Sequence, residues 1–333
     1  MKKHLFLFLS LSFLLSCQPE NSAESLSGNA LGTTYNIKYF SEEELEVKPA
    51  LDSIFHFINS SMSTYQDDSD ISRINNGDTS VLVDEHFVKV FKASQKIYED
   101  SEGYFDPTVG NLVNAYGFGP EEKPEQPDVA YLDSLHRLVG FDKLQLGADN
   151  RIRKAEPGIY IDFNAIAKGY AIDVIAEYFD ENDVSDYLIE LGGELVAKGR
   201  NIQKDSDWIV AIDDPEQTEG ERTFQTILAL QDRAMATSGN YRKFSTDSSG
   251  NTFVHTINPL TGRAEKNDLL SASVLAENCT LADAYASAFM AMGFEKAVAL
   301  LEKLDNVEAY FIYVNKGEPE VYASEGFKKV LRE

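Results

Sequence analysis

The spacing of apolar residues predicts several amphipathic helices along the chain. Where apolar side chains recur every three or four positions, they fall on one face of a helix. This spacing occurs in five stretches, which are residues 42–62, 84–98, 129–139, 166–179 and 280–304. The helices are therefore distributed over the whole chain.

Strand patterns are interleaved with these helices and become denser in the second half. Short apolar or alternating runs occur at residues 29–40, 141–146, 158–162, 187–191, 208–212, 224–230, 253–257, 271–276 and 309–314. Segments 234–244 and 253–264 are further compatible with a hairpin. Because helices and strands do not alternate strictly, the pattern favours an α+β fold over a doubly wound parallel sheet.

The first residues have the pattern of a secretory signal. Two lysines precede a short apolar run, which ends in Leu14-Leu15-Ser16-Cys17, and this run is too short to span a bilayer. The ending resembles a bacterial lipobox, in which Cys17 would be lipidated; an ordinary cleaved signal is the alternative. We therefore expect a signal peptide at 1–16, a polar tether at 17–29 and one folded domain at 30–333. The mature protein would be lipid-anchored and face the periplasm, on either the inner or the outer membrane.

Charge and cysteine content narrow the possible partners. The net charge is −25 and the pI is near 4.5, so the chain repels nucleic acid and anionic lipid headgroups, and nucleic acid is excluded as a partner. A diphosphate ligand would need a cation to bind here. The two cysteines are Cys17 and Cys279, so with Cys17 lipidated no disulfide is expected.

The stretch DFNAIAKGYAID (162–173) carries the first candidate chemistry. It sets Asp162 and Lys168 where a short strand is expected to lead into a helix. Free N–H groups at the start of a helix favour an anion, yet the stretch lacks the GxxxxGK[ST] spacing of a P-loop. An acid beside a phosphate-binding element indicates an intervening metal ion.

A second candidate lies in LADAYASAFMAMG (281–293). Asp283 and Ser287 are four residues apart on a predicted helix, so they share one face. Alanines surround them, and a buried acid there needs a partner. One interpretation is a helix cap or a hydrogen-bonded pair. The other is a magnesium ion, which accepts one or two protein carboxylates and completes its shell with water and phosphate oxygens.

Several weaker signals allow a structural or a functional interpretation. Tyr65 follows a predicted helix in a polar loop, as a surface residue or a ligand platform. GYFDPTVGNLVNAYGFG (103–119) is either a glycine-rich connector or backbone packed around a flat ligand. Gly192-Gly193 fits a plain tight turn better than a ligand contact. His255 precedes a turn-rich segment and is either a structural residue or a catalyst.

These motifs, in this order, resemble the FAD:protein FMN transferase (ApbE) family. The resemblance runs from about residue 30 to 315 through eight ordered blocks: LGTTY (31–35), MSTY (62–65), FDPTVGNLVNAYGFG (105–119), DFNAIAKGYAID (162–173), LGGEL (191–195), ATSGNY (236–241), HTINPLTG (255–262) and ADAYAS (282–287). It implies a single two-lobed α+β domain of ApbE type, with T-fold-like mixed α/β packing and not a Rossmann fold. It also implies FAD as substrate and Mg²⁺ as cofactor.

The resemblance also implies roles for individual residues. The backbone carbonyl of Ala165 and the side chains of Asp283 and Ser287 would bind the metal. His255 would assist phosphoryl transfer as the candidate base. The flavin nucleotide would contact the remaining set: Leu31, Tyr65, Tyr104, Phe105, Asp106, Asp162, Lys168 and Ile257.

Three positions depart from the family's pattern. Asn258 stands where the family usually has Asp, so a carboxylate that could orient His255 is replaced by an amide. Ser287 stands where threonine is common, which keeps the hydroxyl but leaves its rotamer less fixed. Leu31 replaces a frequent methionine, a small change of an apolar wall.

The activity that the resemblance implies is transfer of the FMN half of FAD to a serine or threonine hydroxyl of an acceptor protein, with release of AMP. Acceptors would be flavoproteins with such a site, in particular subunits of membrane redox complexes. The alternatives are an FAD diphosphatase, in which water attacks, and a flavin-binding lipoprotein without turnover.

Overall fold

The computed structural model describes residues 23–121, 127–215, 223–239, 244–246, 252–254, 256–264 and 266–332. Its centre is a sheet with the strand order β1-β2-β5-β6-β9-β12-β13-β14, in which every neighbouring pair is antiparallel. The strands are β1 (Glu24–Ala30), β2 (Thr33–Phe40), β5 (Asp186–Leu191), β6 (Glu194–Lys198), β9 (Arg233–Gly239), β12 (Leu269–Ala276), β13 (Glu308–Asn315) and β14 (Glu318–Ala323). The α+β prediction is therefore confirmed, and the parallel sheet of a Rossmann fold is excluded.

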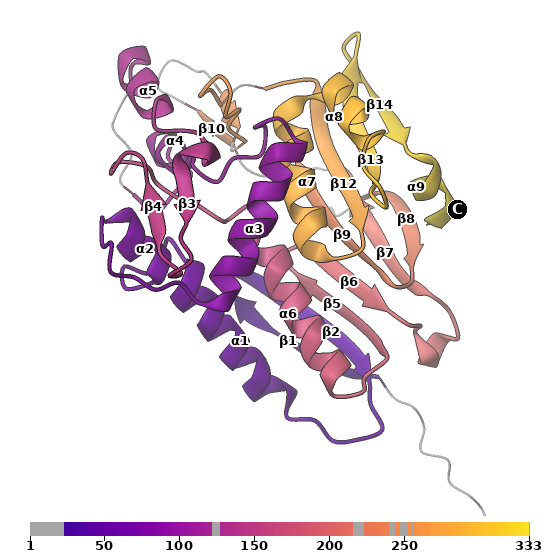
Figure 1. Cartoon of the computed structure of the whole chain (residues 1–333). Coiled ribbons are helices and arrows are strands. Elements are labelled where there is room, and N and C mark those ends of the chain that lie inside the picture. The colour runs from indigo at the N-terminus through magenta and orange to yellow at the C-terminus, as the bar shows by residue number, and fades with distance from the viewer. Residues whose placement is uncertain are drawn as a thin grey trace, which may run out of the picture.

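Helices cover one face of this sheet (Figure 1). They are α1 (Val47–Met62), α3 (Glu85–Asp100), α6 (Ala167–Glu181), α7 (Cys279–Met292) and α8 (Phe294–Leu301). Helix α6 packs on β5 and β6, and α7 packs on β9, β12 and α6. In α1 the residues Val47, Leu51, Phe55 and Ile58 are buried, which is the spacing that turns one helical face toward the core. The main core thus lies between the helices and the sheet.

The opposite face of the sheet is covered by a small antiparallel sheet. It consists of β7 (Trp208–Asp213), β8 (Phe224–Leu230) and β15 (Leu331–Arg332), and α9 (Glu325–Val330) lies beside it. Trp208, Leu228 and Phe327 form a second core with Met235 and Tyr310 of the central sheet. Because strand side chains alternate between faces, β9 and β13 contribute to both cores.

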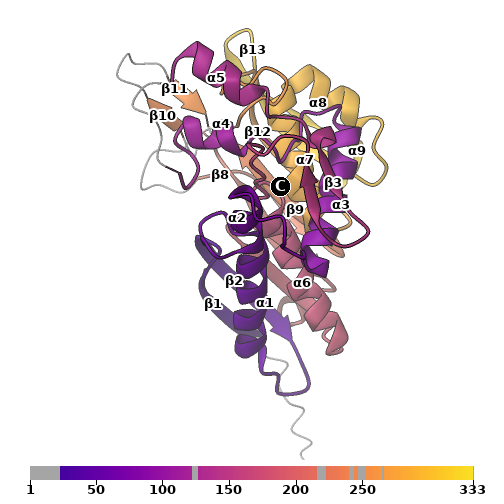
Figure 2. The same ribbon diagram turned by 60° about the vertical axis from the view of Figure 1, so that its left-hand side comes forward.

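The remaining elements are short and lie mostly around the upper left of Figure 1. Figure 2, turned by 60°, again shows α4, α5, β10 and β11 together at one end of the molecule. They are α2 (Asp70–Asn75), α4 (Gly110–Ala115), α5 (Val129–His136), the 3₁₀ turns η1 (Phe141–Lys143) and η2 (Ile202–Lys204), β3 (Leu144–Leu146), β4 (Ile152–Lys154), β10 (Phe244–Thr246) and β11 (Thr252–Val254).

The predicted strand at 29–40 is a hairpin in the structure. Leu31 and Gly32 form the turn, with left-handed φ angles of 49° and 75°, and residues 24–30 pair with β2 from Glu24 opposite Tyr39 to Ala30 opposite Thr33. The pairing places the start of the fold at Glu24, so the expected tether at 17–29 extends too far into the chain. Residues 1–22, including Cys17, lie outside the described residues. Within the described part of the chain, no helix is long and apolar enough to cross a membrane.

Two further predictions of elements are wrong in detail. Residues 158–162 form no strand, and their pairing is limited to a single bridge between Tyr160 and Val109. The predicted helix at 280–304 is two helices, because Gly293 takes a left-handed φ of 78° between α7 and α8. The first error arises where a loop carries apolar residues that packing buries, among them Ile159 and Ile161.

Candidate functional site

Asp283 lies at the point where α7 meets the start of α6. Its side chain is buried, and its Oδ2 accepts a hydrogen bond from the Gly169 backbone N–H at 3.1 Å. The N–H groups of the first turn of a helix have no partner within the helix, and Ile166 at the N-cap of α6 provides no side-chain cap. Asp283 therefore caps α6 from a neighbouring helix, where the helix dipole favours a negative charge.

The carbonyl of Ala165 lies just outside α6. Ala165 precedes the N-cap residue Ile166, so it is not part of the helix. The N–H of Gly169 donates to Asp283, and among the described residues no hydrogen bond to the Ala165 carbonyl is found. A backbone carbonyl that is free to bind a cation thus lies one turn before the residue that contacts Asp283.

Gly169 is required at the crossing of α6 and α7. A Cβ atom there would lie 2.3 Å from the Cys279 carbonyl oxygen and 2.9 Å from Asp283 Cβ. These distances are too short for van der Waals contact, and the first involves backbone that cannot turn aside. Only a glycine lets α6 approach α7 closely enough for its N–H to reach Asp283.

We expect Gly169→Ala to lower the free energy of unfolding by about 3 kcal/mol, because overpacking a well-packed contact costs about 1–3 kcal/mol and the cap is lost as well. Chemical denaturation measures this. Gly158→Ala is the matched control, because its added methyl group would meet only Leu138 side-chain atoms, at 3.2 Å and beyond. Equal stability of the two variants would contradict the close approach of α6 and α7.

Lys168 joins two buried carboxylates at this site. Its Nζ lies 2.8 Å from Glu194 Oε1 and 3.6 Å from Asp283 Oδ2. Burial alone would lower the pKa of Lys168, but the charges of Asp283 and Glu194 outweigh it and raise the pKa. Burial raises the pKa of Glu194, although the positive charge of Lys168 opposes the shift. Lys168 is therefore a fixed positive charge.

Two hydroxyl groups, those of Ser287 on α7 and Ser238 on β9, lie close together one turn of α7 beyond Asp283. Ser287, one turn after Asp283, has its Oγ 3.3 Å from the Oγ of Ser238 on β9. Ser238 belongs to the ATSGNY segment (236–241). The structure therefore brings Lys168, Asp283 and Ser287 together, and it adds Glu194 and Ser238, which the sequence motifs contain but do not single out.

The donor set fits a hard divalent cation. Asp283 offers an oxygen beyond the one that caps α6, Ala165 a free carbonyl and Ser287 a hydroxyl. Glu194 Oε2 is buried and has no hydrogen-bond partner among the described residues, and the Lys168 ammonium faces two carboxylates, those of Glu194 and Asp283. No group of three or more histidine, cysteine or acidic side chains suited to a metal occurs in the described residues. A magnesium ion, which takes one or two carboxylates and completes its shell with water and phosphate oxygens, suits such a site.

Asp162 and Tyr65 form a second part of the site. Asp162 is buried, and its Oδ1 accepts a hydrogen bond from the Asn164 N–H at 2.7 Å. Burial raises the pKa of Asp162. Tyr65 is 63% exposed, and partial burial followed by the nearby charge of Asp162 raises the pKa of its hydroxyl. An exposed aromatic ring beside a buried acid is suited to a flat polar ligand.

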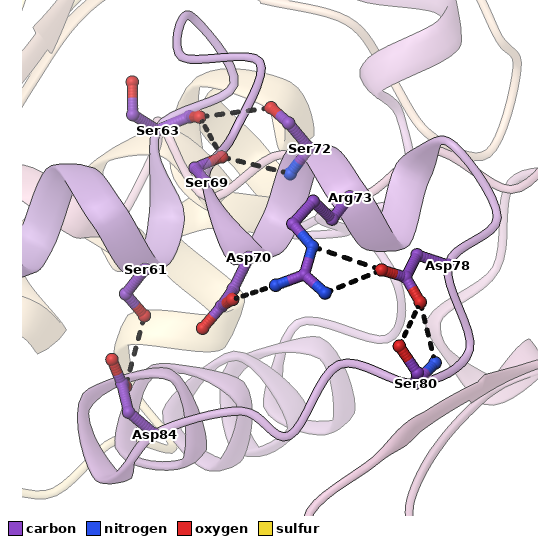
Figure 3. A network of polar contacts seen from close by, with 9 residues as sticks. All are labelled: Ser61, Ser63, Ser69, Asp70, Ser72, Arg73, Asp78, Ser80 and Asp84. Carbon is purple, nitrogen blue, oxygen red and sulfur yellow. Dashed lines mark hydrogen bonds and ion pairs between the residues drawn. The ribbon is translucent and has the colours of Figure 1, made fainter.

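A polar network holds the loop that carries Tyr65 (Figure 3). Ser69 Oγ donates to the Ser63 carbonyl at 2.7 Å and accepts from the Ser72 N–H at 3.1 Å. Arg73 then pairs with Asp70 on one side and Asp78 on the other. The loop between α1 and α2 is thus fixed at its base, so Tyr65 extends from a well-ordered support.

The side chains of the Tyr104–Asp106 segment bind other residues of the protein. The Asp106 carboxylate accepts hydrogen bonds from the Thr108 N–H at 2.8 Å, the Thr108 hydroxyl at 2.6 Å and the Phe141 N–H at 3.1 Å. Phe105 is buried in the main core, and the Tyr104 hydroxyl accepts from Lys296. The Phe105 and Asp106 side chains are therefore structural, and any ligand contact of these two residues would come from their backbone.

Asp106 gives a prediction for the pH dependence of stability. Burial raises its pKa from 3.8 to about 6 in spite of its hydrogen bonds. Between these values the folded protein binds more protons than the unfolded chain, so the contribution of Asp106 to stability falls as the pH rises. Two pKa units correspond to about 3 kcal/mol. From pH 4 to pH 7, we expect the free energy of unfolding of Asp106→Asn to increase relative to that of the wild type, by up to about 3 kcal/mol. Urea denaturation across this range checks it, and a constant difference would contradict the assignment.

The other predicted residues occupy turns and a small core. Leu31 is in the β1–β2 turn and packs against the main core. Ile257 is buried with Leu112 and Tyr116 in a third cluster, so its side chain is used in packing. Asn258 Oδ1 accepts from the Leu260 N–H at 3.0 Å, which fixes the turn after Ile257. His255 lies outside the described residues.

A groove of about 790 Å³ lies elsewhere, along α6 between α3 and the β6–β9 strands. It is lined by residues such as Lys89, Lys92, Tyr170, Asp173 and Leu281. None of the predicted site residues lines it. The site is therefore assigned from the buried charged cluster at the start of α6 and not from the size of a cavity.

Comparison with known proteins shows extensive similarity. A sequence model described as the ApbE family matches residues 31–311. The chain is 35% identical to an FAD:protein FMN transferase of Haemophilus influenzae, over 95% of this chain and 94% of the relative. It is 34% identical to the FAD:protein FMN transferase of Vibrio cholerae, over 99% of both chains. The solved structure of the flavin transferase ApbE from Vibrio cholerae aligns with a TM-score of 0.83 at 34% identity and covers 93% of this chain and 100% of that chain.

Proposed function

The chain belongs to the ApbE family, and on this basis we propose that it is a flavin transferase that moves the FMN half of FAD onto a serine or threonine hydroxyl of an acceptor protein. The observation that carries the proposal is the buried cluster of Asp283, Lys168 and Glu194 at the start of α6. Its elements are those needed to hold a diphosphate on an acidic protein, namely a fixed lysine and a carboxylate for a cation.

The reaction replaces the phosphoanhydride bond of the FAD diphosphate by a phosphate ester to the acceptor. The acceptor oxygen attacks the phosphorus of the FMN half, a new P–O bond forms, and the bond from that phosphorus to the bridging oxygen of the diphosphate breaks. AMP leaves with the bridging oxygen. The hydroxyl proton passes to a base, for which His255 is the proposed residue. No redox change occurs, and catalysis consists of positioning and of neutralising charge.

The described residues divide the remaining tasks. Tyr65 would support the flat part of the nucleotide, and Asp162 would accept hydrogen bonds from its polar groups. Lys168 would offset the charge of the diphosphate. Asp283, Ser287 and the Ala165 carbonyl would hold Mg²⁺, which when bound supplies positive charge next to the diphosphate oxygens.

Magnesium and acceptor dependence test this proposal. The protein is incubated with FAD, with and without Mg²⁺ and with and without an acceptor, and AMP, free FMN and protein-bound flavin are measured. We expect AMP and bound flavin in equal amounts, and neither after chelation of Mg²⁺. AMP with free FMN would identify a diphosphatase. Absence of AMP under all conditions would identify a flavin-binding protein without turnover.

We also propose that Cys17 is lipidated and holds the enzyme at a bacterial membrane, facing the periplasm. The support is the Leu-Leu-Ser-Cys ending and the polar residues 18–22 that precede β1. An enzyme held there could reach membrane redox-complex subunits as acceptors.

Cys17→Ala is expected to leave the precursor unprocessed by lipoprotein signal peptidase, because the lipid-bearing residue is lost. Immunoblotting of membrane and soluble fractions measures processing and localisation. A variant that matures and partitions into membranes at the wild-type level would contradict lipidation at Cys17.

A further inference from the structure

Two buried carboxylates compete for one lysine at the start of α6. The Lys168 ammonium is 2.8 Å from Glu194 and 3.6 Å from Asp283. The first distance is that of a charge-assisted hydrogen bond and the second is beyond hydrogen-bond range. The side chains of Glu194 and Asp283 are only 8% and 3% exposed, so neither ion pair is much weakened by water. In this structure the Lys168 ammonium is therefore hydrogen-bonded to Glu194 and not to Asp283.

The position of Glu194 explains why it can do so. It is the first residue of β6, directly after the Gly192-Gly193 turn, and α6 packs over β6. The strand fixes the backbone of Glu194, whereas Lys168 has a long and flexible side chain. Without the carboxylate of Glu194, the nearest anionic group within reach of the ammonium would be Asp283.

A direct ion pair between Lys168 and Asp283 would oppose the use of Asp283 as a cation ligand. Within the described residues, the only hydrogen bond to the Asp283 carboxylate is the one from Gly169. A lysine on the same carboxylate would have to be displaced before a metal ion could bind there. Glu194 also has an oxygen, Oε2, that is buried and unpaired in the described part of the chain. A buried unpaired oxygen lowers stability, so a purely structural role accounts poorly for this carboxylate.

We propose that Glu194 is a positioning residue that draws the Lys168 ammonium away from Asp283 and so keeps the Asp283 carboxylate open to a divalent cation. This inference rests on the proposed function insofar as Asp283 is the cation ligand. It adds a residue that the metal and flavin assignments above do not include.

The test is a titration of the full chain with Mn²⁺ as the probe, in the absence of FAD, with free Mn²⁺ followed by electron paramagnetic resonance. The readout is affinity and is independent of turnover. The variants are Glu194→Gln, Lys168→Met, their double variant and Asp283→Ala. Glu190→Gln is the matched control, because Glu190 is on the same hairpin but bonds Asn36 and the Gly193 N–H instead of Lys168.

We expect Glu194→Gln to weaken Mn²⁺ binding at least tenfold and Glu190→Gln to change it less than threefold. Lys168→Met should strengthen binding at least tenfold more in the Glu194→Gln background than in the wild type, because only there does the lysine lie on Asp283. Affinity of Glu194→Gln near the wild-type value would overturn the role of Glu194. Equal effects of Lys168→Met in both backgrounds would overturn it too. They would show that the charge of Lys168 weakens Mn²⁺ binding to the same extent whether or not Glu194 holds the ammonium.

Two further measurements keep these outcomes distinct. Wild-type Mn²⁺ affinity in Asp283→Ala would overturn the cation site of the proposed function itself, and Glu194 with it. If Glu194→Gln does not fold, as judged by thermal unfolding, Glu194→Asp replaces it. That variant retains the charge but is shorter by one methylene, so it cannot hold the ammonium in the same place. We still expect weaker binding, and wild-type affinity would again overturn the proposal.

Discussion

Replacing Asp283 by alanine is expected to abolish Mg²⁺-dependent release of AMP from FAD, at least a thousandfold below the wild type. Asp283 is the only side-chain carboxylate assigned to the metal, and it is buried next to the start of α6. Loss of a metal ion from a phosphoryl-transfer site removes several kcal/mol of charge stabilisation in the transition state. The measurement is AMP formation at saturating FAD over a range of Mg²⁺ concentrations.

The cap that Asp283 provides to α6 calls for a second variant. Asp283→Ala also loses the hydrogen bond from Gly169, at a cost of about 1 kcal/mol in stability. Asp283→Asn keeps an acceptor oxygen for that N–H but is a much weaker magnesium ligand. We expect Asp283→Asn to be nearly as stable as the wild type and yet inactive, whereas Asp305→Ala, at an exposed position, should be fully active. Normal turnover of Asp283→Asn at unchanged magnesium demand would mean that Asp283 is only a helix cap.

Replacing His255 by alanine is expected to slow flavin transfer by a hundredfold or more while FAD affinity stays within a few-fold of the wild type. A hydroxyl is a poor nucleophile near neutral pH, and a positioned base contributes about 10²–10⁴-fold in rate. FAD binding is assigned to other groups, among them Tyr65, Asp162 and Lys168. Fluorescence titration of FAD and a gel assay of covalent flavin on the acceptor measure the two effects separately.

The control for His255 is His56→Ala. His56 is exposed on α1 and belongs to none of the site assignments, so transfer should remain at the wild-type rate. Transfer by His255→Ala near the wild-type rate would show that His255 is structural. Joint loss of binding and transfer would show that it shapes the pocket.

The sequence predicted those parts of the site that depend on local periodicity. Asp283 and Ser287 were placed on one helical face, and α7 (Cys279–Met292) presents them one turn apart. Lys168 was expected at the start of a helix, and α6 begins at Ala167. Helical spacing is a local property, so these relations can be predicted without knowledge of tertiary contacts.

The parts that were missed depend on contacts between distant segments. Glu194 is in a short strand after a glycine turn, and only the packing of α6 over β6 brings it to Lys168, 26 residues earlier. The need for Gly169 arises from the backbone of Cys279 on another helix. The β1–β2 turn at Leu31 and Gly32 was missed because it falls inside the run 29–40, which has the pattern of a single strand. No periodicity in the sequence encodes such neighbours.

Asp106 shows what a motif leaves open. The family resemblance places it at the flavin nucleotide, which stays a prediction, while in the structure its carboxylate binds Thr108 and the Phe141 N–H and holds the 103–119 segment against the core. An acid beside a proline in a loop is as well suited to an internal turn as to a ligand. The motif identified the right region, whereas the hydrogen bonds decide the role of the side chain.

The mass of an acceptor protein after incubation with the enzyme, FAD and Mg²⁺ tests the central claim most directly. The account predicts that an acceptor with a serine or threonine flavinylation site gains the mass of one FMN less one water, with one AMP released per acceptor. The same acceptor with that hydroxyl residue replaced by alanine should gain nothing. An unmodified acceptor alongside AMP and free FMN would contradict flavin transfer.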